Sequence, residues 1–302
     1  MKPLIIGTRD SQLALWQAKT VQKKLKANGV ESVLYPVKST GDLNLDVPLY
    51  DMGITGIFTK TLDVALIKGD IDLAVHSMKD VPTQLPKTVV KGAVLKRANP
   101  HDVLVHKGLD FLEEKNGHIA TGSLRRKAQW LNKYPDHEIS NLRGNVNTRL
   151  RKLNESLWNG AIFAAAGLER INIKPQNTQT LEWMIPAPAQ GAMLVVTRED
   201  KTDVIEALKL LNHKETEICV EIERSLLRTL EGGCSAPIGA LATIQGNKIE
   251  LEAVLLSLDG KKRYHIKKYR ALNDCKDFGE TCALHILREG GDMLMLRLKQ
   301  KL

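Results

Sequence analysis

The sequence has few cysteines and no long apolar run. No two cysteines are spaced as CxxC, which argues against a zinc ribbon and against a disulfide framework. No segment approaches the roughly 20 apolar residues that cross a bilayer, and the N-terminus reaches Arg9 and Asp10 too early for a secretion signal. We therefore expect a protein of the reducing cytoplasm with no membrane association. The four cysteines are Cys219, Cys234, Cys275 and Cys282.

Aromatic residues and the common cofactor motifs are also scarce. Aromatics make up 4% of the chain, too few for a surface that stacks many bases. Neither the phosphate loop GxxxxGKS/T nor the dinucleotide motif GxGxxG occurs, which argues against a nucleotide site. The eight histidines show no metal-ligand spacing, so we expect no metal.

Basic residues, by contrast, are in excess. The formal net charge is +9, which predicts an anionic partner. Residues 121–152 hold eight basic and two acidic side chains, with only Trp130 and Tyr134 as aromatics. A nucleic-acid binder is one alternative and would show affinity that falls steeply with salt. The shortage of aromatics favours a smaller acid, and we expect no nucleic-acid partner.

The pattern of apolar residues predicts an α/β protein of three domains. Short apolar segments alternate with amphipathic ones, as in a helix expected over residues 11–27, and this order is typical of a largely parallel sheet. A junction is expected near Pro100, and the segment MIPAPAQGAMLVV returns the chain to the first unit. From residue 214 a long helix and hairpin signals predict a smaller α+β domain with an antiparallel sheet. The expected domains are 1–98 with 193–213, then 99–192, and finally 214–302.

Candidate ligand-binding residues follow the predicted strands, where open α/β sheets bind ligands. Arg9 and Ser11 follow the first strand; Ser11 could simply cap a helix, or the pair could bind an anion. Lys79 and Asp80 follow the third strand; they could form a surface ion pair, or Asp80 could be a buried carboxylate that faces a substrate. His76, on the apolar strand itself, is best interpreted as a core histidine.

A row of arginines is the most informative feature of the second unit. Positive side chains recur at successive strand-to-helix junctions, whereas a solvent-exposed helix face usually carries both positive and negative side chains. Arginine binds carboxylates and phosphates through two donors, so the row predicts a ligand with several acid groups, of a kind left open. The arginines are Arg125, Arg126, Arg143, Arg149 and Arg170.

Cys234 lies in the segment EGGCSAPIGA, after the long predicted helix. A free cysteine is most often a buried structural thiol. The preceding glycines and the position in a loop favour instead a nucleophile or an attachment point. Both interpretations stand on these residues alone.

Taken together, the motifs resemble the porphobilinogen deaminase family, also called hydroxymethylbilane synthase. The similar stretches cover about four fifths of the chain. They are GTRDSQLALWQ, AVHSMKDVP, TGSLRRKAQ, LRGNVNTRL, AAAGLERI, PAPAQGA and ERSLLRTLEGGCSAPIGA. The family joins four porphobilinogen molecules into linear hydroxymethylbilane, with loss of one ammonia per unit, on a dipyrromethane primer. Such an enzyme is a transferase of heme and tetrapyrrole biosynthesis.

The resemblance assigns roles to particular residues. It implies that Asp80 is the catalytic aspartate and that Cys234 holds the dipyrromethane through a thioether. Phe58 and Gln190 would line the substrate pocket. The residues that would bind the carboxylates of cofactor and substrate are Arg9, Ser11, Lys79, Ser123, Arg125, Arg126, Arg143, Arg149 and Arg170.

The resemblance also implies a fold and an assembly state. The first two domains would resemble the lobes of periplasmic binding proteins, with the active site between them, in a protein that acts as a monomer. A binding-only protein with the same two lobes is the alternative; it would not need Cys234. Three residues depart from the family pattern: Thr55 replaces a loop lysine, Gly122 replaces a serine, and Ala236 stands where a β-branched residue is common.

Overall fold

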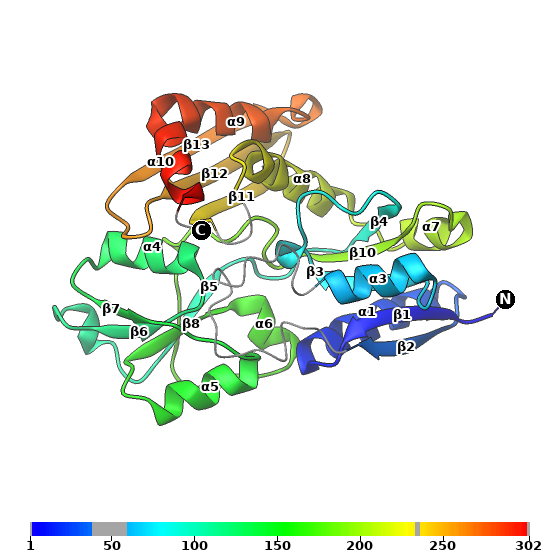
Figure 1. Ribbon diagram of the computed structural model, residues 1–302, viewed down its shortest axis with the longest axis horizontal. Coiled ribbons are helices and arrows are strands. Elements are labelled where there is room, and N and C mark those ends of the chain that lie inside the picture. Colours follow the sequence, from blue (N-terminus) through cyan, green and yellow to red (C-terminus); the bar gives the residue numbers. More distant parts are fainter. Residues whose placement is uncertain (1, 38–58, 233–235, 301–302) are drawn as a thin grey trace.

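The structure is a computed structural model that describes residues 2–37, 59–232 and 236–300. Phe58, Cys234 and the departure at Thr55 therefore lie outside the described residues. Figure 1 shows two α/β lobes side by side, with a third unit packed over both. The described residues form three sheets of five, five and three strands. The predicted fold class, two α/β units followed by an antiparallel α+β unit, is confirmed by these strand orders.

The first lobe is built on a mixed sheet with strand order β2-β1-β3-β10-β4. Strands β1, β2 and β3 are parallel, as predicted, whereas β10 runs antiparallel to both of its neighbours. Strand β10 belongs to the part of the chain that returns to this sheet after the second lobe. The strands are β1 (Leu4–Arg9), β2 (Ser32–Val37), β3 (Leu73–Ser77), β4 (Val89–Val94) and β10 (Met193–Arg198).

Among the described residues, three helices cover this sheet. Helix α1 follows the prediction closely: the Ser11 side chain accepts a hydrogen bond from the Ala14 amide at its start, and Asn28 ends it. Its buried face includes Ala18, Val21 and Leu25, which pack on the sheet as the periodicity predicts. The helices are α1 (Gln12–Ala27), α3 (Lys60–Lys68) and α7 (Thr202–Lys209), and the 3₁₀ turn η2 (Met78–Asp80) follows β3.

The second lobe repeats the plan with strand order β7-β6-β8-β5-β9. Strands β6, β7 and β8 are parallel, so their carboxyl ends and the arginines that follow them lie at one edge of the sheet. Strand β5 is antiparallel to β8 and β9. The strands are β5 (Asp102–His106), β6 (His118–Ala120), β7 (Glu138–Ser140), β8 (Gly160–Ala164) and β9 (Thr178–Thr180). The helices are α4 (Leu124–Lys133), α5 (Val146–Glu155) and α6 (Ala165–Arg170), with the 3₁₀ turn η3 (Asp110–Leu112).

Two segments, 95–101 and 181–192, connect the lobes. They run beside each other, since the Ala98 amide donates to the Gly191 carbonyl at 3.1 Å and the Leu95 amide to the Met193 carbonyl at 3.1 Å. Ala189 has a φ of 62°, a left-handed conformation that is uncommon outside glycine. These two segments are the covalent connections between the lobes, so a rotation of one lobe relative to the other would have to change their backbone angles.

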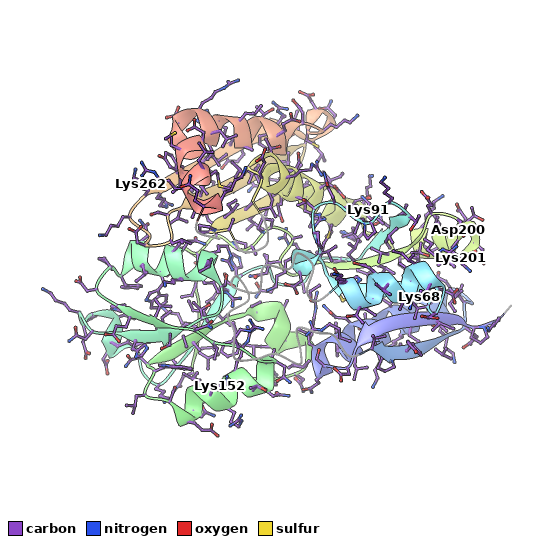
Figure 2. The ribbon with its side chains drawn as sticks, viewed as in Figure 1. Lys68, Lys91, Lys152, Asp200, Lys201 and Lys262 are labelled. Atoms are coloured by element: carbon purple, nitrogen blue, oxygen red, sulfur yellow. The ribbon has the colours of Figure 1, made fainter. Side chains whose placement is uncertain are left out.

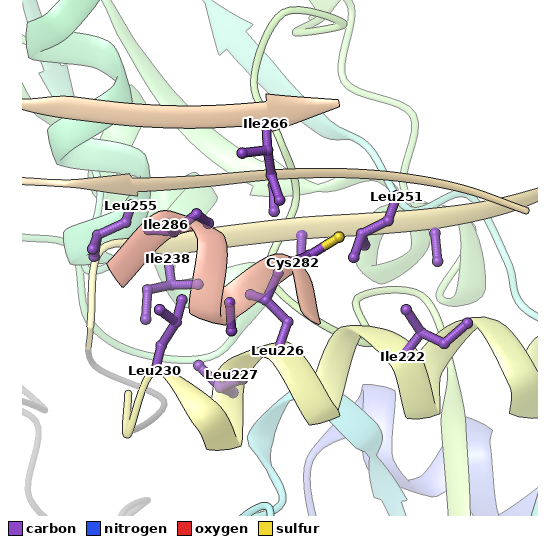
Figure 3. Packing of buried hydrophobic residues seen from close by; sticks show 14 of the residues in the cluster. Ile222, Leu226, Leu227, Leu230, Ile238, Leu251, Leu255, Ile266, Cys282 and Ile286 are labelled. Carbon is purple, nitrogen blue, oxygen red and sulfur yellow. The ribbon is translucent and has the colours of Figure 1, made fainter. Parts of the chain in front are cut away.

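The third unit packs an antiparallel sheet against the long helix α8. Figure 3 shows Ile222 and Leu226 of this helix, and Leu230 directly after it, pointing toward the sheet, opposite Leu251 and Ile266. Burial of this apolar face is the main force that holds the unit together. The strands are β11 (Ile238–Gln245), β12 (Lys248–Leu256) and β13 (Arg263–Ala271). The helices are α8 (Lys214–Thr229), η4 (Leu272–Asp274), α9 (Phe278–Ile286), the π-helix η5 (Leu287–Gly291) and α10 (Asp292–Lys299).

The third unit contacts both lobes. Lys91 of β4, labelled in Figure 2, forms ion pairs with Glu217 and Glu221 of α8 at 2.7 and 2.8 Å. On the other side, the Asn132 side chain at the end of α4 donates to the Gly260 carbonyl at 2.8 Å. Within the described ranges, no helix has the length and apolar character needed to span a membrane.

Candidate active site

The first lobe presents its candidate residues at the carboxyl edge of its sheet. Arg9 is the last residue of β1, and Ser11 caps α1, as one of the two sequence interpretations expected. Lys79 and Asp80 occupy the η2 turn directly after β3, and both are half-buried. The parallel pairing of β1 and β3 brings these residues to the same edge of the sheet.

In the second lobe, Arg125 and Arg126 lie in the first turn of α4 and are buried, which is unusual for charged groups. Ser123 caps the helix. Both guanidinium groups bind the carboxylate of Asp102, the first residue of β5, with an Nη1–Oδ2 distance of 2.7 Å for Arg125 and an Nη2–Oδ1 distance of 2.7 Å for Arg126. Burial alone would raise the pKa of Asp102, but the two arginines hold that pKa well below its usual range. Part of the arginine row is thus already neutralised within the protein.

Arg143 and Arg149 follow β7, one in the connecting loop and one in the first turn of α5. The side chain of Arg149 donates from Nε to the Gly144 carbonyl at 2.8 Å. Burial and the positive charge of Arg126 lower its pKa to about 10, with Asp80 of the first lobe opposing the shift. The charges of both lobes therefore act on Arg149.

Gln190 connects the two lobes at the crossing segments and is fully buried. Its Nε2 donates to Oδ1 of Asp102 at 2.9 Å and to the Pro100 carbonyl at 2.7 Å. Its Oε1 accepts a hydrogen bond from Nζ of Lys79 at 3.1 Å. Burial lowers the pKa of Lys79 to about 8, against the opposing influence of Asp80. A continuous polar chain therefore runs from the η2 turn to the arginines of α4.

Arg170 lies apart from this chain, in the last turn of α6. Its Nη2 donates to the Gly191 carbonyl at 2.5 Å, and its guanidinium lies over the ring of Trp16 at 5.8 Å from the centroid. A cavity of about 300 Å³ opens beside these two side chains and is also lined by Lys24 and Met193. The structure thus brings most of the sequence-predicted residues together but sets Arg170 against α1.

The assembled side chains suit an anion with several carboxylates. Lys79 and Arg9 come from one lobe and Arg143 and Arg149 from the other, so a ligand between the lobes would meet cations on both sides. Guanidinium groups bind carboxylates through two parallel hydrogen bonds, which fixes orientation as well as adding affinity. Asp80 is the carboxylate of the η2 turn, close enough to Arg149 to act on its pKa.

Comparison with known proteins identifies the family of the chain. Residues 4–206 match the family model described as porphobilinogen deaminase, dipyromethane cofactor binding domain, and residues 217–288 match its C-terminal domain. The chain belongs to the porphobilinogen deaminase family. The porphobilinogen deaminase of Desulforamulus reducens is 41% identical over 97% of this chain and 96% of its own length. The Trichlorobacter lovleyi porphobilinogen deaminase is 41% identical over 99% of this chain and 98% of its own.

Solved structures of two-lobed binding proteins are also similar to the chain. One is ytmK, a probable amino-acid transporter binding protein of Bacillus subtilis. The match has 12% identity and a TM-score of 0.42, and it covers 69% of this chain and 89% of ytmK. The periplasmic VFT2 domain of Bordetella pertussis BvgS gives 9% identity and a TM-score of 0.42 over 69% of this chain and 86% of its own. The fold of the chain is defined by its own strand orders, given above.

The donor groups of the site fit a dipyrromethane, which carries several carboxylate side chains. Beyond the cations already described, Nε of Arg125 is buried and has no hydrogen-bond partner among the described residues. A buried donor without a partner is costly, and a ligand carboxylate or a water would satisfy it. The attachment residue predicted from the sequence, Cys234, lies outside the described residues, as does Phe58.

Gly122, one of the departures from the family pattern, has a packing reason in this chain. A Cβ at this position would lie 2.5 Å from the Leu142 carbonyl oxygen. Real side chains do not tolerate that distance, so the glycine permits the close approach of the β6 and β7 ends. Glycine in place of the family's serine therefore affects the backbone contact with Leu142, beside α4. It leaves Ser123, Arg125 and Arg126 in place.

Sequence reasoning missed three charged residues that organise the site. Asp102 holds the arginines of α4, Glu223 of α8 binds the crossing segments, and Arg224 of α8 binds the η2 turn. Each stands within or beside an otherwise apolar pattern, since Asp102 opens the strand DVLV and Glu223 and Arg224 interrupt the buried face of α8. A charge at a predicted core position is the signal that could have identified them.

Proposed function

We propose that this protein acts as a hydroxymethylbilane synthase through the residues assembled between its lobes. As a member of the porphobilinogen deaminase family it is a transferase of tetrapyrrole biosynthesis, and a dipyrromethane is its cofactor. It condenses four porphobilinogen molecules head to tail, releases one ammonia for each, and hydrolyses the product from the primer. The observation that carries the proposal is the meeting of cations from both lobes around Asp80 and Arg149.

The cations bind the acetate and propionate groups of substrate and growing chain. Each pyrrole ring carries two carboxylates, so a chain of six rings presents about twelve, and arginines on both lobes supply directional donors. Hydrogen bonds of this kind contribute about 1.5–3 kcal/mol each. The residues proposed for this role are Arg9, Ser11, Lys79, Ser123, Arg125, Arg126, Arg143, Arg149 and Arg170.

Asp80 supplies the negative charge that the reaction needs. Positive charge develops on the pyrrole nitrogens as ammonia leaves and the new carbon–carbon bond forms. A carboxylate fixed in the η2 turn stabilises that charge without reorganising, and it also accepts or returns a proton at its oxygens.

The cofactor, when bound, supplies a fixed pyrrole chain end whose free α-carbon attacks the incoming unit. Cys234 is its proposed anchor through a thioether, and Phe58 and Gln190 are proposed to line the pocket for the substrate ring. Gln190 is buried between Lys79 and Asp102, which supports a place at the back of the pocket. Cys234 acts on this proposal as an attachment point rather than as the catalytic group.

Several broader properties belong to the same proposal. We assign residues 1–98 with 193–213 to the first domain, 99–192 to the second and 214–302 to the third, supported by the three sheets. We also propose that the protein works as a monomer in the cytoplasm, with porphobilinogen as its partner and with neither nucleic acid nor membrane involved.

Intact mass measurement of the purified protein tests the function. The wild type should carry excess mass equal to two pyrrole units, and Cys234→Ser should lack it. Asp80→Asn should keep the excess mass and the fold yet form no bilane from porphobilinogen. An unmodified mass in active wild-type protein would contradict the proposal, and so would near-normal turnover by Asp80→Asn. A binding-only protein would show neither the excess mass nor ammonia release.

A further inference from the structure

Arg224 of α8 reaches out of the third unit and into the first lobe. Its side chain is buried, with 6% of the residue exposed. The guanidinium Nη1 lies 2.9 Å from the Val81 carbonyl oxygen and 3.4 Å from that of Met78, and Nη2 lies 2.6 Å from the Pro82 carbonyl oxygen. One side chain thus binds three backbone carbonyls of a five-residue stretch.

That stretch is the turn that carries Asp80. Residues 78–80 form η2, and the backbone leaves the turn at Val81, whose amide bonds back to the Met78 carbonyl at 3.2 Å. Carbonyls at the end of a short helix lack donors within the helix, and buried ones need partners from elsewhere. Arg224 supplies those donors on both sides of Asp80 in the sequence, and so restricts the backbone from which that side chain projects.

Arginine is well suited to this arrangement. Its planar guanidinium offers donors in a fixed fork, whereas a lysine ammonium is a single point on a flexible stem. Two carbonyls at 2.6 and 2.9 Å from different nitrogens are therefore held at a set spacing. A lysine at this position would keep the positive charge but would hold only part of the turn.

The same helix serves two other parts of the site. Glu223, the residue before Arg224, binds Arg97 and the Ala189 amide of the crossing segments. Helix α8 ends at Thr229, five residues before Cys234, the proposed cofactor anchor. One rigid element therefore relates the η2 turn, the crossing segments and the start of the segment that contains the anchor.

We propose that Arg224 is a positioning residue that sets the Asp80 carboxylate in its working orientation from the cofactor-bearing unit. It acts through the backbone of residues 78–82, whose carbonyl groups it binds. This inference rests on the proposed catalytic role of Asp80. Carboxylate misplacement of about 1 Å lowers turnover by roughly a hundredfold in enzymes that depend on fixed geometry.

Steady-state kinetics of Arg224→Met and Arg224→Lys test the inference, with Arg228→Met as the matched control. Arg228 lies on the exposed side of the same helix, one turn later. For Arg224→Met we expect kcat to fall about 10- to 100-fold with KM within about threefold, and with the excess mass of the cofactor retained. Arg224→Lys should have a kcat between those of Arg224→Met and the wild type. If Arg224→Met does not fold, the kcat of Arg224→Lys alone tests the inference. Arg228→Met should match the wild type.

The double variant Asp80→Asn with Arg224→Met separates positioning from general stability. If Arg224 acts through Asp80, the double variant should be no slower in single-turnover ammonia release than Asp80→Asn alone, because effects within one unit are not additive. A further loss in the double variant would overturn the inference. Wild-type kcat in folded Arg224→Met or Arg224→Lys would also overturn it, as would a folded variant that lacks the cofactor mass. Failure of the wild type to form bilane would instead contradict the proposed function.

Discussion

The carboxylate of Asp102 binds the guanidinium of Arg126 through two nitrogens, with Nε and Nη2 at 3.0 and 2.7 Å from Oδ1. Both residues are buried, and Arg125 binds the other carboxylate oxygen at 2.7 Å. Three charges with a net value of +1 therefore lie where the lobes join. Asp102 therefore fixes the positions of Arg125 and Arg126. Their N–H groups that do not bind Asp102 are held in a set orientation toward a ligand.

Replacement of Asp102 by asparagine should strongly destabilise the protein. The substitution leaves two buried guanidinium groups without their counter-charge, and loss of one partner of a buried pair costs about 3–5 kcal/mol. Denaturant unfolding of the apoprotein measures the change in free energy of unfolding. Asp110→Asn is the control, because Asp110 is exposed in η3 and its replacement should change that free energy by less than about 0.5 kcal/mol. Equal stabilities for the two variants would contradict the role given to Asp102.

Arg149→Met should weaken substrate binding, whereas Arg151→Met should not. Both arginines lie on α5, but Arg151 is exposed and pairs with Glu155 at 2.8 Å, while Arg149 faces the charges of both lobes. Loss of a charged hydrogen bond of about 1.5–3 kcal/mol predicts a rise in KM of roughly 10- to 150-fold. Initial rates over a range of porphobilinogen concentrations measure it. A similar KM for both variants would remove Arg149 from the binding site.

Lys79 should make substrate binding depend on pH near 8. Its pKa is lowered to about 8 by burial, so its charge is present below that pH and is lost as the pH rises through it. Since the charged form binds carboxylates, kcat/KM should fall above pH 8, with an inflection that reports the free enzyme. The control is Lys79→Arg, because a guanidinium at this position stays charged over the whole range and should remove the inflection. An unchanged inflection in that variant would assign the titration to another group.

The sequence predicts the strands, the long helices and the loops of the site, because these depend on local periodicity and on the edge where parallel strands end. Helix α1 and its cap at Ser11 match the prediction to within a residue. The antiparallel strand β10 could not be read from periodicity, because the direction of a strand depends on where the chain has travelled before it. Its segment was nevertheless identified as a return to the first unit.

The sequence also could not predict which arginines are paired within the protein and which remain available for a ligand. Arg126 and Arg149 look alike in a row of basic residues, and only the fold brings Asp102, 23 and 24 residues before the α4 arginines, into contact with them. Arg170 was grouped with the others by its sign of charge, yet in the structure it contacts Trp16 and Gly191. Long-range contacts of this kind depend on how the elements pack, which a local pattern does not encode.

Glu223→Gln should loosen the connection between the third unit and the crossing segments. The buried carboxylate accepts hydrogen bonds from Arg97 at 2.5 and 3.1 Å and from the amides of Ala189 and Ala242 at 2.6 and 2.8 Å. A glutamine has one acceptor oxygen, so its amide group would face donors that it cannot satisfy. We expect a loss of about 3–5 kcal/mol in the free energy of unfolding, measured by denaturant titration.

A matched pair of controls separates this buried contact from surface charge. Glu221→Gln removes the ion pair between Glu221 and Lys91. The Glu221 side chain is 45% exposed, and surface pairs of this kind contribute about 0–1 kcal/mol to stability. Arg97→Met combined with Glu223→Gln should lose less than the sum of the two single variants, because both remove the same interaction. Additive losses would mean that Arg97 and Glu223 stabilise the protein independently, which would contradict the role given to their contact.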